Sequence, residues 1–297
     1  MKSPDLSWSL RWQIAQALCG LYRFQTQRVA RRMFEGCAPE TFVERKLFGY
    51  KFTGDVSRAS PQQLIYLIGE RFIPEAEIIR GLVTPGMRVV DVGANIGYYV
   101  LLFASLIGPD GMIVAIEPSP ENLRELALNV TRNALNNVEI VAKAAGNETG
   151  EIGIKEGLNS GVTTDERARF TVQQDRIDNI VRGRVDFLKI DVEGYEGLAL
   201  KGAERMLSEQ RPILFCEVHP ALLPQYGADA KEVVRLAGQY YDKMTIYEPN
   251  LPRAAIGKMM ARYAGRALRR VVDIGEYLGR LPESAEPFWL VCAPGRK

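Results

Sequence analysis

The sequence has little histidine, little cysteine and no long apolar run. His219 is the only histidine among 297 residues, which excludes a multi-histidine metal centre, so a zinc site would need cysteines or carboxylates. Arg11 interrupts the one stretch that could serve as a signal peptide, and no apolar run reaches the ~18 residues that a membrane span requires. Four cysteines stand far apart without a CxxC pair: Cys19, Cys37, Cys216 and Cys292. We therefore expect free structural thiols, in a cytoplasmic protein that does not cross a membrane.

The net charge of +2 conceals two basic ends and an acidic middle. Residues 1–51 and residues 251–297 each carry nine Lys/Arg against four Asp/Glu, which is +5 at either end and leaves −8 between them. The composition is otherwise that of a globular chain, with 46% apolar and 25% charged residues, and its length allows one large domain or two small ones. Disorder, collagen and coiled coil are excluded.

Both basic ends carry amphipathic segments. Over residues 8–32, tryptophans and other apolar side chains recur near helical spacing among arginines. A helix packed on the body or on a second subunit, as in a homodimer, is the favoured interpretation, and peripheral contact with an anionic membrane surface is the alternative. Residues 251–286 repeat the pattern, which predicts a basic helical insertion. Residues 1–60 show no strand pattern, so we expect a helical N-terminal extension there, followed by one domain over residues 61–297.

Between residues 86 and 249, short apolar runs alternate with helical stretches, as in repeated βα units around a parallel sheet. The pattern predicts helices over Ile96–Ile107 and from Pro120, with Ser119 as N-cap. Residues 148–156 are Gly-rich and alternating, which predicts a hairpin beside the third strand. The expected strands are Arg88–Val92, Met112–Glu117, Val138–Ala144, Val185–Val192, Ile213–His219, Met244–Tyr247 and Phe288–Val291.

A glycine-containing loop follows the first expected strand and reads Asp91-Val92-Gly93-Ala94-Asn95-Ile96-Gly97. Such a loop lets a ligand approach the backbone amides at a helix N-terminus. Its spacing is GxxxG rather than the GxGxxG of dinucleotide enzymes, and it opens with an acid. Asp91 would repel a pyrophosphate but could accept hydrogen bonds from an ammonium group, and Glu117 at the second strand end could hold two ribose hydroxyls. Together these features suggest S-adenosylmethionine, with a tight structural turn as the alternative.

The fourth expected strand carries a lysine in its interior. Lys189 must find an acid there, because an unpaired charge in a buried strand is costly to desolvate. Asp91 and Glu117 are the candidate partners. Asp191 and Glu193 follow at the carboxyl edge, where open α/β sheets bind ligands.

The fifth expected strand ends at the single histidine. His219 shares a strand face with Glu217, whereas Cys216 lies on the other face, which argues against a Cys/His nucleophilic pair. His219 is the candidate general base, with Asp191 or Glu193 orienting it or acting instead. No metal is assigned, and a divalent cation held by Glu217 and the same two carboxylates is the less favoured alternative.

Five segments follow in order along the chain: VVDVGANIGYY (89–99), IVAIEPSPENLRELALNV (113–130), RIDNI (176–180), VDFLKIDVEGYE (185–196) and ILFCEVH (213–219). In these segments the sequence resembles the FkbM family of S-adenosylmethionine-dependent methyltransferases. The resemblance implies an α/β, Rossmann-like class I methyltransferase fold, a mostly parallel seven-stranded sheet with the last strand antiparallel. It also implies O-methylation, the transfer of a methyl group to a hydroxyl of a sugar, glycan or natural product.

The resemblance carries site residues over by position. It implies a donor loop formed by Asp91, Gly93, Ala94, Asn95 and Gly97. The ribose would be held by Glu117, with its neighbour Pro118, and the donor would also contact Ala145 near the third strand. The reacting centre would be faced by Asp191 and Glu193. The acid that many class I enzymes carry near the end of the third strand is absent, so adenine would depend on backbone groups or on Asn147.

The acceptor is expected to be a small molecule or glycan, with S-adenosylhomocysteine as the second product. The alternative is a macromolecular or lipid-linked acceptor, such as RNA, protein or a membrane glycan, that uses the basic ends. Nucleic acid is disfavoured, because DVEG (191–194) stands where amide-nitrogen methyltransferases carry an NPPY-like tetrapeptide.

Overall fold

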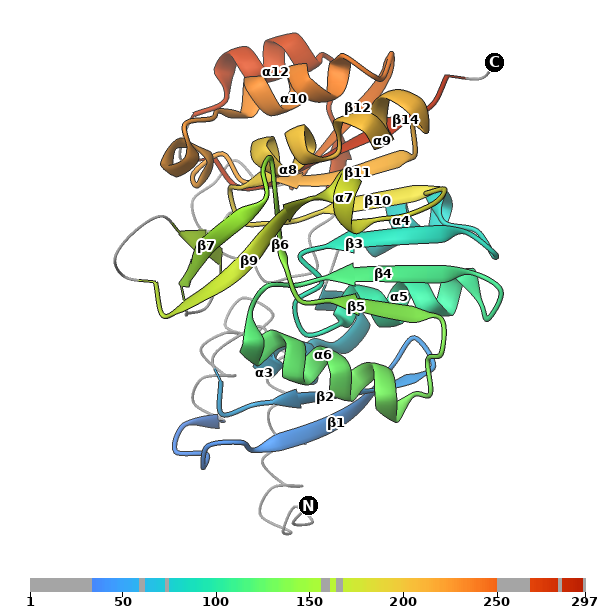
Figure 1. The fold of residues 1–297 in the computed structure, drawn as a ribbon, viewed down its shortest axis with the longest axis vertical. Helices are drawn as coiled ribbons and strands as arrows, with labels where there is room; N and C mark the ends of the chain where they lie inside the picture. The colour runs from blue at the N-terminus through green and yellow to red at the C-terminus, as the bar shows by residue number, and fades with distance from the viewer. Residues whose placement is uncertain are drawn as a thin grey trace. The chain divides into compact units, whose positions relative to one another are not determined.

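The computed structural model describes residues 34–58, 62–72, 75–155, 161–163, 168–249, 268–282 and 285–295 (Figure 1). The chain divides into two compact units, one formed by residues 1–76 and 250–267 and the other by residues 77–249 and 268–297. The amphipathic segment 8–32 and the insertion residues 251–267 lie outside the described residues. No helix in the described part is both long and apolar enough to cross a membrane.

The described part of the first unit contains a β-hairpin, so the expected helical extension over residues 1–60 is wrong at this point. Strands β1 (Phe42–Leu47) and β2 (Tyr50–Asp55) pair antiparallel, with Leu47 opposite Tyr50. The two residues between them, Phe48 and Gly49, both have positive φ, as a two-residue hairpin turn requires. Helix α3 (Gln62–Ile68) and the 3₁₀ turn η2 (Gly69–Phe72) follow.

The second unit is built on an eight-stranded sheet in the order β13-β12-β14-β11-β10-β3-β4-β5 (Figure 1). Strands β3, β4, β5, β10 and β11 run parallel, and β14 is antiparallel to both of its neighbours. The strands are β3 (Arg88–Val92), β4 (Met112–Ile116), β5 (Val138–Val141), β10 (Phe187–Ile190), β11 (Ile213–Val218), β12 (Lys243–Pro249), β13 (Leu268–Arg270) and β14 (Phe288–Ala293).

The class I methyltransferase arrangement predicted from the sequence is therefore confirmed, with one strand more than the expected seven. The extra strand is β13, which pairs antiparallel with β12 inside the segment expected to be a helical insertion. Its three residues, Leu-Arg-Arg, carry too few apolar side chains to show a strand pattern. Helix α12 (Ile274–Arg280) follows β13 and is the helical part of this segment among the described residues.

Helices connect and cover the strands. Helix α5 begins at Tyr98 rather than Ile96, and Ser119 occupies the N-cap of α6 as predicted. The helices are α4 (Ala76–Leu82), α5 (Tyr98–Ile107), α6 (Pro120–Arg132), α7 (Ile177–Ile180), α8 (Glu196–Gly202), α9 (Glu204–Glu209), η3 (Leu223–Tyr226) and α10 (Ala230–Gly238).

A second, four-stranded sheet has the order β6-β9-β7-β8. It corrects two expectations. The predicted third strand is two strands in different sheets, and residues 150–155 of the expected hairpin pair with β9 and β8 instead of with that strand. Ile152 and Ile154 account for this pairing, because they pack in a separate core with Ala144, Val162 and Tyr195. The strands are β6 (Ala144–Gly146), β7 (Gly150–Lys155), β8 (Gly161–Thr163) and β9 (Phe170–Arg176).

The two faces of the large sheet differ in character. One face packs apolar strand residues such as Val90 and Leu188 against helices α8 to α10, including Leu200 and Leu207. The residues alternating with these include Phe187, whose ring lies 5.6 Å from the ring of Phe103 in α5. The second face also contains charge.

A buried ion pair joins β3 to β10 on the second face. Lys189 Nζ lies 3.1 Å from Asp91 Oδ1, and the two residues are register partners in the parallel pair. Their side chains are 1% and 0% exposed. Lys189 Nζ also lies 3.4 Å from Asp191 Oδ2 and 4.2 Å from the ring centroid of Tyr99. Of the two partners considered for Lys189, the structure selects Asp91.

Two glycines in α8 provide a matched test of the packing between α8 and β6. A Cβ on Gly202 would lie 1.9 Å from the carbonyl oxygen of Gly146, whereas a Cβ on Gly197 would make ordinary contacts with Ala228 Cβ at 3.6 Å and Val233 Cγ2 at 3.9 Å. Gly202→Ala should lower the free energy of unfolding by roughly 1–3 kcal/mol or more in urea titrations, because the backbone must move. Gly197→Ala should leave it unchanged or raise it by up to about 1 kcal/mol. Equal effects would contradict this packing.

The buried pair predicts a much larger effect of lysine removal than a surface pair does. Lys189→Ala should lower the free energy of unfolding by about 3–5 kcal/mol, because Asp91 is left buried without its counter-ion. The control is Lys201→Ala, which removes a solvent-exposed pair with Glu232 at 3.0 Å and should cost less than about 1 kcal/mol. Urea titrations of both variants measure the difference, and a mild effect of Lys189→Ala would refute the structural role of the pair.

Candidate active site

The loop between β3 and α5 is held against the end of β10 by a glycine. Gly93 has φ +80°, and a Cβ there would lie 1.8 Å from the carbonyl oxygen of Asp191. No other residue fits at this position without a backbone shift. Gly97, with φ +91°, caps α5, and a Cβ on it would press on Leu126 at 2.9 Å. The two glycines of the GxxxG spacing therefore serve close packing of the loop.

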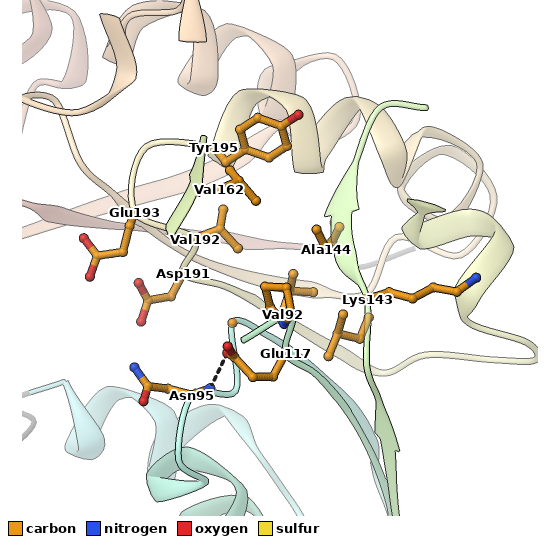
Figure 2. A pocket seen from close by; sticks show the side chains of 14 residues that line it. Val92, Asn95, Glu117, Lys143, Ala144, Val162, Asp191, Val192, Glu193 and Tyr195 are labelled. Carbon is orange, nitrogen blue, oxygen red and sulfur yellow. Dashed lines mark hydrogen bonds between the residues drawn. The ribbon is translucent and has the colours of Figure 1, made fainter. Parts of the chain in front are cut away.

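Glu117 at the end of β4 holds this loop through its carboxylate. Its Oε2 accepts the Asn95 N–H at 2.8 Å (Figure 2), and its Oε1 accepts from the Ser119 N–H at 2.9 Å and from the Asn122 amide at 3.1 Å. Oε2 thus retains more acceptor capacity than Oε1. Burial raises the pKa of Glu117 to about 7, although these hydrogen bonds act in the opposite direction.

A pocket lies at the carboxyl ends of β3, β4 and β10. Figure 2 shows the side chains of Asn95, Asp191 and Glu193 on the same side of the pocket, whereas Lys143 extends away from them. Lys143 is paired instead with Asp175, at 2.9 Å. The lining residues are Val92, Gly93, Asn95, Ile116, Glu117, Pro118, Lys143, Ala144, Ala145, Val162, Asp191, Val192, Glu193 and Tyr195.

Most of the predicted cofactor residues meet in this pocket. Those that line it are Gly93, Asn95, Glu117, Pro118, Ala145 and Asp191. Asp91, Ala94 and Gly97 are not among the lining residues. Asp91 lies deeper, with Oδ1 bound to Lys189 and Oδ2 buried without a hydrogen-bond partner. Asn147, considered for adenine, is not in the lining either, and its carbonyl accepts from Arg176 at 2.7 Å.

His219 lies beside the pocket, close to two of its carboxylates. Its Nε2 is 3.6 Å from Glu193 Oε2, 3.7 Å from Glu217 Oε1 and 3.9 Å from Asp191 Oδ1. The structure thus brings the three predicted catalytic residues, His219, Asp191 and Glu193, together. Each of them offers one ligand atom within 4.8 Å of the others, so the same group could hold a divalent cation.

Sequence reasoning missed the residue on the other side of the imidazole. Glu196 Oε1 lies 2.8 Å from His219 Nδ1. Its position in the segment KIDVEGYE, three residues after Glu193 and at the start of α8, was the available signal. Burial lowers the pKa of His219, but the hydrogen bond to Glu196 and the charges of Glu196, Glu217 and Glu193 outweigh it and raise that pKa well above its usual value.

Comparisons with known proteins match this chain to two methyltransferase families. Residues 91–242 match the family described as "Methyltransferase FkbM domain", and residues 22–151 match "Protein-L-isoaspartate(D-aspartate) O-methyltransferase (PCMT)". A protein-L-isoaspartate O-methyltransferase of Triticum aestivum is 40% identical over 58 residues, which are 20% of this chain and 25% of that protein. An arsenite methyltransferase of Halobacterium salinarum is 36% identical over 55 residues, 18% and 14% of the two chains. The chain thus spans about a quarter or less of these relatives.

Among solved structures, a methyltransferase FkbM from Methylobacillus flagellatus KT has a TM-score of 0.43 and 21% identity, covering 62% of this chain and 48% of the other. Fibrillarin of Aeropyrum pernix, in complex with S-adenosyl-L-methionine, has a TM-score of 0.37 and 14% identity, covering 57% and 66%. The family match spans about half of the chain and includes the loop between β3 and α5, the strand β10 and His219. On that match, the chain belongs to the FkbM family of S-adenosylmethionine-dependent methyltransferases.

Proposed function

We propose that this protein transfers the methyl group of S-adenosylmethionine to a hydroxyl of a sugar, glycan or natural-product small molecule. The observation that carries the proposal is the shared position of two carboxylates. Asp191 and Glu193 line the pocket that also contains Glu117, and both face His219 Nε2. A donor site and a group able to take a proton are therefore adjacent.

The pocket residues suit the donor. Glu117 Oε2 has acceptor capacity for a ribose hydroxyl, and the carboxylates of Asp191 and Glu193 favour the positive charge of the donor. Ala144, Ala145 and other small or apolar lining residues provide surface for an adenine ring. When bound, the donor supplies an electrophilic methyl group on a sulfonium. The pocket's own contribution is to align an acceptor oxygen with that methyl group, since in-line transfer depends chiefly on orientation.

His219 is the group that can take the acceptor's proton. As the acceptor oxygen bonds to the methyl carbon and the carbon–sulfur bond breaks, the hydroxyl proton moves to His219 Nε2, and sulfur keeps the bonding electron pair as a neutral thioether. Asp191 and Glu193 then stabilise the imidazolium through their charge. A hydroxyl acceptor needs such a base, which is why the cluster favours O-methylation.

The charge around His219 bears on the acceptor class. Asp191, Glu193 and Glu217 are 22%, 27% and 17% exposed at their side chains, so negative charge surrounds the proton-accepting nitrogen. This charge disfavours a phosphate near the reacting hydroxyl, whereas neutral polyols can donate hydrogen bonds to carboxylates. The cluster therefore supports a neutral sugar or small-molecule acceptor over RNA.

Removal of Glu117 should weaken donor binding. Glu117→Ala deletes the carboxylate that shapes the donor loop, and the loss of charged hydrogen bonds of about 1.5–3 kcal/mol each should reduce affinity about 10- to 100-fold. Isothermal titration calorimetry with S-adenosylmethionine measures this change. The control is Glu121→Ala, in the first turn of α6. Glu121 pairs with Arg169 at 3.8 Å and is not among the residues that line the pocket. Unchanged affinity in Glu117→Ala would overturn the donor-site assignment.

Removal of the imidazole should separate binding from turnover. His219→Gln should keep donor affinity close to that of the unmodified protein and lose about 100-fold or more of its methyl transfer, because proton removal is lost. S-adenosylhomocysteine formation with a panel of neutral sugars and phenols measures turnover. The neutral imidazole is the active form and its pKa is raised, so kcat of the unmodified protein should increase with pH through and above neutrality. Full activity in His219→Gln would exclude His219 as the base.

A further inference from the structure

We infer that Glu196 is a positioning residue that keeps the proton of neutral His219 on Nδ1 and so presents Nε2 as the proton acceptor. The inference rests on the proposed function for the role of Nε2. The hydrogen-bond arrangement that carries it is independent of any acceptor or donor.

The direction of the hydrogen bond follows from the backbone. Glu196 Oε1 accepts the Gly194 N–H at 2.9 Å and faces His219 Nδ1 at 2.8 Å. A backbone N–H can only donate and an ionised carboxylate can only accept, so the proton of the second hydrogen bond belongs to the ring nitrogen. Gly194 reaches this position with φ +98°, and a Cβ on it would lie 2.6 Å from Leu222 Cβ. The loop that contains Gly194 thus fixes the position of Glu196 Oε1, the hydrogen-bond acceptor for Nδ1.

His219 Nε2, the other ring nitrogen, faces several carboxylates but makes no direct hydrogen bond to them. The carboxylates facing Nε2 lie at 3.6–3.9 Å, beyond direct hydrogen bonds, and their charge would attract a proton to Nε2. Without Glu196, the neutral ring would therefore carry its proton on Nε2 and could not accept another. The charged groups that face the ring are Asp191 and Glu193 after β10, Glu196 of α8 and Glu217 of β11. Beyond them, Lys189 is bound to Asp191, and Cys216 and Tyr226 interact electrostatically with these carboxylates rather than with the ring.

The second oxygen of Glu196 shows that the carboxylate is not a simple structural link. Glu196 is 0% exposed, and its Oε2 is buried without a hydrogen-bond partner. An unsatisfied buried oxygen is costly, and a single neutral acceptor would already serve Gly194. A full carboxylate at this position instead stabilises the imidazolium that forms when Nε2 takes a proton, as the aspartate does in serine-protease triads.

The single histidine allows a direct test. In the 297-residue chain without a histidine tag, labelled with ¹⁵N-histidine, all histidine ring signals belong to His219. Above the pKa of His219, NMR should show a protonated Nδ1 and an unprotonated Nε2. Glu196→Ala should exchange the two signals, and Glu196→Gln, which keeps an acceptor oxygen without the charge, should retain the Nδ1–H form with a lower pKa. A protonated Nε2 in the unmodified protein, or an unchanged tautomer in a folded Glu196→Ala, would overturn the inference.

Glu217→Gln is the matched control, because it removes a charge that faces Nε2 and leaves Nδ1 untouched. It should lower the pKa of His219 and keep the Nδ1–H tautomer. If Glu217→Gln exchanged the signals as Glu196→Ala does, charge alone would set the tautomer and the inference would fail. Calorimetry with S-adenosylmethionine separates this inference from the proposed function. If the unmodified protein did not bind S-adenosylmethionine, the proposed function would be refuted, whereas the tautomer result would be unaffected.

Discussion

The buried ion pair between Lys189 and Asp91 is the interaction on which the site depends. It lies between register partners of β3 and β10, so it joins the two strands whose following loops form the pocket. A buried charge is tolerated only with a close counter-charge, which limits the relative movement of the two strand ends. Lys189 also contacts Asp191 at 3.4 Å, and this contact extends the pair from the sheet core into the pocket lining.

The loops that follow β3 and β10 contact each other next to the Lys189–Asp91 ion pair. The space over Gly93 is filled by the Asp191 carbonyl, and the Gly93 and Ala94 N–H groups donate to the Ile116 carbonyl at the end of β4. Three neighbouring strand ends are thereby tied together before any ligand binds. Preorganisation of this kind lowers the cost of binding, because few side chains have to be ordered when the ligand arrives.

The sheet and its chemistry were largely predictable, because strands buried on both faces appear as apolar runs and because charge in a strand interior requires a partner. Lys189 was recognised on this ground, although its partner could be chosen only from the register. The β1–β2 hairpin was missed, since its alternation is weak and its turn is signalled only by Gly49. The division of residues 138–146 between two sheets depends on packing of Ile152 and Ile154, which no local pattern reveals. Glu196 was missed because its role depends on the turn at Gly194.

Asp191 lines the pocket and also faces two charged partners, and this limits how the site can be dissected by mutation. It lines the pocket, lies 3.4 Å from Lys189 Nζ through Oδ2 and lies 3.9 Å from His219 Nε2 through Oδ1. Residues that share one charge network do not contribute additively. A substitution at Asp191 would therefore change the contact with Lys189, the pocket lining and the surroundings of the imidazole together. By contrast, Glu117 bonds to the loop after β3, and Glu196 and His219 bond to each other. The function of the pocket is consequently better tested at these three positions than at the carboxylate that connects them.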